Sequence, residues 1–202
     1  KAHGIERVAT IDWDVHHGNG TEKIFYDDPS VLSISLHQNN LYPPDSGAID
    51  AQGEGAGKGA NLNIPLPPGS GSGAYRHAFE QLVLPALEQF KPELVVIPSG
   101  FDSCALDPMG MQMLESRDYA WMTKRLMEVA DKHAKGRIIV THEGGYSPVY
   151  VPYCGVAVLE TLSEANATFE DPFSDFIAGY GGQSLTPDQK KLIHDVKDAF
   201  FS

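Results

Sequence analysis

Residues 8–20 read Val-Ala-Thr-Ile-Asp-Trp-Asp-Val-His-His-Gly-Asn-Gly, so an apolar run gives way to acids, histidines and glycines. Such a change is typical of a buried strand that leads into a loop at a functional site. Alternation along an extended chain would point Asp12, Asp14 and His16 to one side. We therefore take a metal site as the first hypothesis, against an ordinary surface turn or a helix-capping Asp.

Beyond this stretch, apolar strand-like runs alternate with helix-like apolar stripes. We predict strands over 8–12, 31–36, 61–66, 94–97 and 138–140, and helices over 21–26, 72–90, 116–134, 149–163 and 186–200. Pro85 should kink the second helix or end an early part of it. Ser116 should be the N-cap of the third, and Thr186 with Pro187 should begin the last.

Strands that alternate with helices predict an α/β fold with right-handed crossovers and a mainly parallel central sheet. The 202 residues fit a single domain, 1–202. In such sheets ligands bind beyond the carboxyl ends of the strands. Asp102 and Tyr146 also follow predicted strands, so we expect them near Asp14 and His16. Residues 37–60, rich in Gly, Pro and Asn, are predicted to form a long loop of functional or disordered type.

Composition narrows the classes of partner. The formal net charge is −12 and no Lys/Arg-rich run is present, which argues against nucleic acid. No run is apolar enough for a membrane span or a secretion signal, and two cysteines give no disulfide framework. We expect a cytoplasmic protein with free thiols. Its acidity is compatible with a cationic small molecule or a Lys-rich peptide.

The candidate ligands define a chemistry. Asp14, His16 and Asp102 form a three-ligand set, and catalytic zinc sites keep three protein ligands and leave positions for water and substrate. The same oxygen-rich set also suits Fe²⁺. Zinc would polarise a substrate carbonyl and acidify bound water. Tyr146 follows two glycines and could donate a hydrogen bond to a developing oxyanion, or it could simply be a packed tyrosine.

Four segments together resemble the histone deacetylase family: Asp-Trp-Asp-Val-His-His-Gly-Asn-Gly-Thr at 12–21, Ser-Leu-His at 35–37, Gly-Phe-Asp at 100–102 with Asp107-Pro108, and Glu-Gly-Gly-Tyr at 143–146. The closer match is to its bacterial class II-like branch, the histone deacetylase-like and acetylpolyamine amidohydrolases. The resemblance implies an arginase/deacetylase-like three-layer fold. It also implies a zinc-dependent deacetylase that removes acetyl or other acyl groups from acetyl-lysine peptides or acetylated polyamines, with a homo-oligomer as one expected state.

The resemblance also implies roles for single residues. Zinc would be held by Asp14, His16 and Asp102, and Tyr146 would stabilise the transition state. Structural potassium (with Na⁺ as an alternative) would lie at two sites, the first formed by Asp12, Asp14, His16, Ser35 and Leu36 and the second by Phe25, Asp28 and Val31. The substrate-lining positions would be Tyr42, Met109 and Gly145.

One feature departs from the family pattern. The family places a His-His pair, the source of its general base, upstream of the Asp-x-Asp-x-His segment, and residues 1–11 contain no such pair. We therefore expect an N-terminally incomplete deacetylase domain, in which Asp12 and Asn19 would orient the missing histidines. His17, His37 and His142 are not expected to replace them. The alternatives are a non-catalytic metal-binding module and a two-metal arginase-like hydrolase that also uses Asp107.

Overall fold

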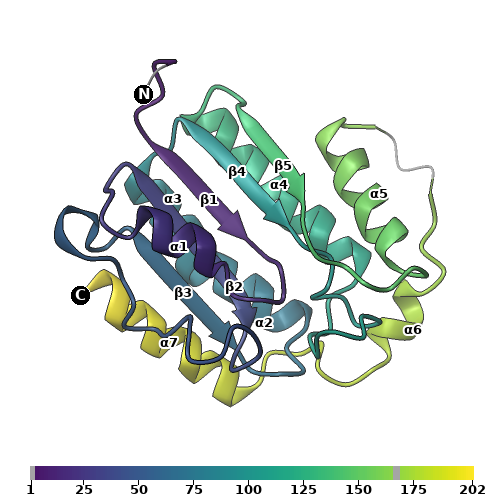
Figure 1. The fold of residues 1–202 in the computed structure, drawn as a ribbon. Helices are drawn as coiled ribbons and strands as arrows, with labels where there is room; N and C mark the ends of the chain where they lie inside the picture. Colours follow the sequence, from purple (N-terminus) through teal and green to yellow (C-terminus); the bar gives the residue numbers. More distant parts are fainter. Residues whose placement is uncertain (1–2, 166–168) are drawn as a thin grey trace.

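Figure 1 shows the computed structural model, which describes residues 3–165 and 169–202. Its strands are β1 (Val8–Asp12), β2 (Val31–Gln38), β3 (Asn61–Leu66), β4 (Leu94–Ser99) and β5 (Ile138–His142). Its helices are α1 (Asn19–Phe25), α2 (Ser72–Ala78), α3 (Leu84–Phe90), α4 (Ser116–His133), α5 (Val151–Leu162), α6 (Ser174–Ala178) and α7 (Pro187–Phe201). Two short segments complete them, the 3₁₀ turn η1 (Gly55–Gly57) and the π-helical η2 (Phe79–Val83).

The five strands form one sheet in the order β3-β2-β1-β4-β5, and every neighbouring pair is parallel. This confirms the predicted α/β class, and the carboxyl ends of β1, β4 and β5 meet at one edge of the sheet (Figure 1). Within the described ranges, no helix is both long and apolar enough to cross a membrane.

Over β2 and β3 the sheet has one apolar and one polar face. Along β2, buried leucine and isoleucine alternate with buried polar residues: Leu32, Ile34 and Leu36 against Ser33, Ser35 and His37. The register continues this division onto β3, where Asn61 pairs with Ser33 and Asn63 with Ser35. The apolar face packs into the core with α2, η2 and α3. The polar face lies under α1, a helix without buried residues, and is therefore a hydrogen-bonded layer.

Several predicted boundaries were wrong, each for a local reason. The helix predicted over 72–90 is divided into α2, η2 and α3, because Pro85 has no N–H to continue the α-helical ladder and the turn before it widens to π geometry. The N-cap of α4 is Glu115, not Ser116. Glu115 is extended and forms a reciprocal capping box with Asp118. Thr186 and Pro187 begin α7 as predicted.

Other elements are displaced or were missed. α1 begins two residues before the predicted Thr21, β2 and β4 extend two residues further, and α5 is shorter by two residues at its start and one at its end. α6 was not predicted, because five residues carry too little periodicity to be recognised.

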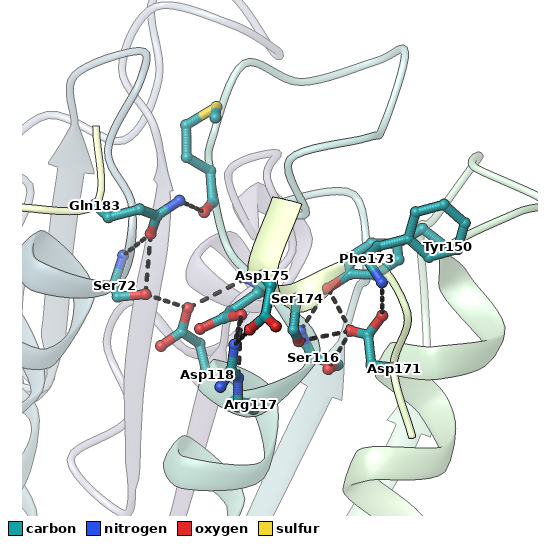
Figure 2. Close-up of polar contacts among 12 residues, drawn as sticks. Ser72, Ser116, Arg117, Asp118, Tyr150, Asp171, Phe173, Ser174, Asp175 and Gln183 are labelled. Carbon is teal, nitrogen blue, oxygen red and sulfur yellow. Dashed lines mark hydrogen bonds and ion pairs between the residues drawn. The ribbon is translucent and has the colours of Figure 1, made fainter. Parts of the chain in front are cut away.

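The carboxylate of Asp171 holds the segment that precedes α6 against the start of α4 (Figure 2). Asp171 Oδ2 accepts hydrogen bonds from Ser116 Oγ at 2.5 Å and from Tyr150 OH at 2.8 Å. It also accepts one from Ser174 Oγ at 3.0 Å, while Asp171 Oδ1 accepts from Phe173 N at 2.8 Å. Tyr150 is fully buried and ends the loop that follows β5, so Asp171 anchors that loop to α4.

This anchor predicts an acid-dependent loss of stability. Burial raises the pKa of Asp171, but the hydrogen bonds from Ser116, Phe173 and Tyr150 lower it by a larger amount. The pKa of Asp171 is therefore below its usual value. A depressed folded pKa stabilises the protein above the unfolded value of about 3.9, and this contribution is lost as the pH falls through the folded value. Asp171→Asn should lower the free energy of unfolding at neutral pH by about 1 kcal/mol.

Urea unfolding between about pH 5 and pH 2 measures the effect, because the Asp171→Asn protein should lose less of its stability over that range than the parent. Asp198→Asn, at an exposed i,i+4 pair with His194, is the matched control and should follow the parent curve. Parallel curves for all three proteins would contradict the anchor.

Candidate metal centre

The ends of two neighbouring strands bring three ligand-type side chains together. Asp14 and His16 follow β1, and Asp102 follows β4, its parallel neighbour. His16 Nδ1 lies 2.9 Å from Asp14 Oδ1 and 3.1 Å from Asp102 Oδ2. One ligand atom from each of the three residues lies within 4.8 Å of the others. The strand-end argument from the sequence therefore predicted a real convergence.

Backbone amides hold the two carboxylates in place. Asp14 Oδ1 accepts from His16 N at 2.8 Å, and Asp14 Oδ2 accepts from Gly144 N at 2.9 Å. Asp102 is fully buried, and its Oδ1 accepts from Val15 N at 2.8 Å. Backbone N–H groups thus hold both carboxylates in place, while Asp102 Oδ2 still faces His16.

Two glycines make room for this arrangement. A Cβ on Gly100 would lie 2.2 Å from Asp14 Oδ2, and one on Gly144 would lie 2.1 Å from Asp102 Oδ2. Real Cβ atoms do not approach other atoms so closely, so any side chain at either position would displace a carboxylate. The sequence analysis missed both roles. The available signal was that each glycine lies within two residues of a strand end.

The donor set fits a divalent cation. Among the described residues, Asp102 Oδ2 is a buried oxygen without a hydrogen-bond partner. Tetrahedral ligands at zinc distances of about 2.0–2.1 Å lie roughly 3.3–3.4 Å from one another, close to the 2.9 and 3.1 Å separations around His16. The carboxylates of Asp102 and Asp14 raise the pKa of His16 to about 10, so the two carboxylates strongly favour a positive charge at this point.

Tyr146 lies on the loop after β5 with its side chain 52% exposed, so the phenol is not packed into the core. Its backbone N donates to Asp107 Oδ2 at 2.6 Å. Partial burial and the nearby carboxylates of Asp102 and Asp14 raise the pKa of Tyr146. The phenol is therefore a neutral hydrogen-bond donor at physiological pH, as the predicted role requires.

The predicted substrate-lining residues surround the same region. The ring of Tyr42 is 64% exposed and meets the ring of His16 edge-on at 6.2 Å. Met109 is exposed, and its backbone N donates to Asp107 Oδ1 at 2.8 Å. Gly145 has a positive φ of 132° and packs against Phe101. Their contacts with a substrate remain predictions.

Three residues of the first predicted monovalent site lie on the neighbouring strands β1 and β2. Asp12 pairs in register with Ser35, and Leu36 follows on the same strand. Asp12 Oδ1 accepts from Asp14 N at 3.0 Å, and burial together with the Asp14 charge raises the pKa of Asp12 well above its usual value. A cation would relieve this cost of burying a carboxylate.

Residues of the second predicted site share one turn between α1 and β2. Asp28 N donates to Phe25 O at 3.1 Å and Val31 N donates to Asp28 O at 3.3 Å. Asn19, the predicted orienting residue, is exposed at the first position of α1.

The remaining histidines of interest are engaged away from the ligand set. His17 contacts Ser46 Oγ and Glu22 Oε2 through its two ring nitrogens, at 3.0 and 3.2 Å. His37 is buried, with Nδ1 3.0 Å from Ser35 Oγ. His142 is the last residue of β5, which extends two residues beyond the predicted 138–140.

A separate hollow of about 710 Å³ lies between α4 and α5. Its lining includes Lys124, Glu128 and Glu160, and none of the candidate metal ligands. This hollow is therefore distinct from the candidate metal centre, which is recognised by the chemistry of its side chains.

This architecture, a parallel sheet with a carboxylate–imidazole cradle at its carboxyl edge, is that of the arginase/deacetylase-like α/β proteins. The chain belongs to the histone deacetylase family, because residues 1–162 match the histone deacetylase domain. The structure of the histone deacetylase Clr3 superimposes with a TM-score of 0.85 and 34% sequence identity, over 98% of this chain and 32% of that chain. The HDA15 HD domain gives 0.85 and 32%, over 99% and 51%.

Relatives in sequence agree. A histone deacetylase-like amidohydrolase of Pseudomonas aeruginosa is 52% identical over 175 residues, which cover 87% of this chain and 46% of the relative. A probable deacetylase of Archaeoglobus fulgidus is 41% identical over 79% of this chain and 45% of its own length. The chain thus spans about half the length of the curated relatives that it matches.

Proposed function

We propose that this chain forms the metal-binding part of a zinc-dependent deacetylase, which hydrolyses the acetyl amide of acetyl-lysine peptides or acetylated polyamines. The convergence of Asp14, His16 and Asp102 at one edge of the sheet is the observation that carries the proposal. Family membership and the names of the relatives support deacetylase or amidohydrolase chemistry. We further propose structural potassium at the Asp12–Ser35 site and a cytoplasmic location.

Each residue of the candidate site would have a distinct role in the hydrolysis. Asp14, His16 and Asp102 would hold the zinc ion, which when bound supplies a Lewis acid for the substrate carbonyl and for water. Tyr146 would donate a hydrogen bond to the carbonyl oxygen as negative charge develops there. Asp107 accepts a hydrogen bond from the backbone N of Tyr146 and so fixes the backbone from which the phenol projects. Tyr42 would line the path of the acyl chain beside His16.

The two-metal arginase-like hydrolase and the non-catalytic metal-binding module are the two alternatives to this proposal. Among the described residues, the side chains whose ligand atoms lie together are Asp14, His16 and Asp102, and the absence of Asp107 from this group disfavours it as a ligand to a second metal ion. The non-catalytic module differs from the proposed deacetylase in one measurable property, because it would bind the metal ion without turning over a substrate.

The proposal predicts one divalent ion per chain and chelator-sensitive turnover of a fluorogenic acetyl-lysine substrate, with acetylputrescine as the competing polyamine. Tyr146→Phe should lower kcat about 10²-fold, since a single oxyanion donor is lost. Metal content should stay unchanged in this variant. Met111→Leu, at an exposed residue outside the ligand set, is the control.

Three outcomes decide between the readings. Two ions per chain would favour the arginase-like alternative. One ion with no turnover in the parent would favour the non-catalytic module. Full turnover by Tyr146→Phe would remove the phenol from the mechanism.

A further inference from the structure

The polar face of the sheet contains a cluster of hydrogen bonds centred on one carboxylate oxygen. Glu22 Oε2, on α1, lies 2.7 Å from Asn61 Nδ2, 2.7 Å from Asn63 Nδ2 and 3.2 Å from His17 Nε2. Asn61 and Asn63 are buried on β3, and the side chain of Glu22 is only 17% exposed. Three donors on one oxygen make a strong acceptor site in a partly buried setting.

The same donors also bind the 39–60 loop. Asn61 Nδ2 donates to Ala51 O at 2.7 Å, and Asn63 Nδ2 donates to Ala48 O at 3.2 Å. The side chain of His17 is 2% exposed, and its Nδ1 contacts Ser46 Oγ at 3.0 Å. Side chains of other elements therefore fasten the loop at Ser46, Ala48 and Ala51, in addition to the backbone hydrogen bonds within the loop and at its ends.

His17 joins this cluster to the candidate metal centre. It directly follows the ligand-type residue His16, and its backbone N donates to Tyr42 O at 3.1 Å. Its ring lies 4.8 Å from the ring of His37, which closes the cluster on the side of β2. His17 thus contacts Tyr42 and the cluster around Glu22, and it is directly bonded to the candidate ligand His16.

We propose that His17 and Glu22 are positioning residues that lock the 39–60 loop and the 14–16 turn into a single unit. We call His17, Glu22, Ser46, Asn61 and Asn63 the clamp. The clamp sets where His16 points, and it sets where the ring of Tyr42 stands beside His16. Its effect on metal binding rests on the proposed function, whereas its effect on the loop does not.

The first test is hydrogen exchange of the metal-free protein. Glu22→Gln keeps the shape of the side chain but replaces a charge-assisted acceptor by a neutral one, so backbone amides in 39–60 should exchange about tenfold faster. Ser46→Ala, at the other end of the clamp, should act in the same direction. Glu54→Gln is the matched control, because Glu54 is exposed in the same loop. Unchanged exchange in both clamp variants, or faster exchange spread evenly over all five strands, would overturn the clamp.

The second test measures the metal centre. Zn²⁺ affinity, determined by chelator competition, should fall about tenfold in Glu22→Gln, as is usual when a group that orients a ligand is lost. The visible spectrum of bound Co²⁺ should also change, whereas Glu54→Gln should match the parent in both. An unchanged affinity and spectrum would confine the clamp to the loop and overturn its positioning role. A parent protein that binds no metal would instead refute the proposed function, and hydrogen exchange would still decide the clamp.

Discussion

Asp102→Ala is expected to abolish stoichiometric binding of a divalent metal, with an affinity loss of about 10³-fold or more. The change removes one of the three proposed ligands, and catalytic zinc sites with three protein ligands have none to spare. The same change leaves Val15 N without its acceptor at the end of β1, which adds a structural cost. Metal analysis after dialysis, together with Co²⁺ titration, measures the effect.

The structural cost of that change can be separated from the loss of the ligand. Asp102→Asn keeps an oxygen that can accept from Val15 N, so its fold should be close to that of the parent. It places a neutral amide where Asp102 Oδ2 meets His16, so metal binding should still fall steeply. Asp198→Ala, at an exposed surface pair, is the control. Parent-like metal content in Asp102→Ala and Asp102→Asn would end the assignment of this site.

Much of this site could be predicted from the sequence, because it follows from topology. Asp14 and His16 lie at the end of one apolar run, and Asp102 lies at the end of another. Parallel strands deliver their carboxyl ends to one edge, so 86 residues of separation between His16 and Asp102 (102 − 16) become a 3.1 Å contact. The rule for the whole sheet was sufficient, whereas the expected alternation was not observed, because β1 ends at Asp12 and residues 14–16 form a bend.

The support around the ligands could not be predicted in this way. The role of Gly144 depends on where a Cβ would point in the folded chain, and glycine in a turn has many ordinary explanations. Glu22 carries no signal in the sequence, since it lies on α1, a short helix without buried residues whose periodicity shows no core face. Its role appears only when Asn61 and Asn63 are brought beneath it by the β2–β3 register.

Gly144→Ala is expected to remove metal binding without removing a single ligand. The added Cβ would lie 2.1 Å from Asp102 Oδ2 and 2.6 Å from Asp14 Oδ2, so both carboxylates must move. The loss of one group that orients a ligand already costs about 10–100-fold in affinity, so displacement of two ligands should cost about 10³-fold or more. The φ of Gly144 is not positive, so alanine meets no backbone strain and the effect should be confined to the cradle.

The comparison with another glycine makes this result interpretable. Gly181 is exposed, its φ is also not positive, and a Cβ there would meet no atom within 4 Å, so Gly181→Ala should bind metal like the parent. Zn²⁺ competition and thermal melting of the two variants separate a blocked cradle from a general loss of stability. If Gly144→Ala binds metal as tightly as Gly181→Ala, then the carboxylates of Asp14 and Asp102 do not hold a common ion. In that case the contact between Gly144 N and Asp14 would be structural, and the cradle would have to be sought among other oxygens.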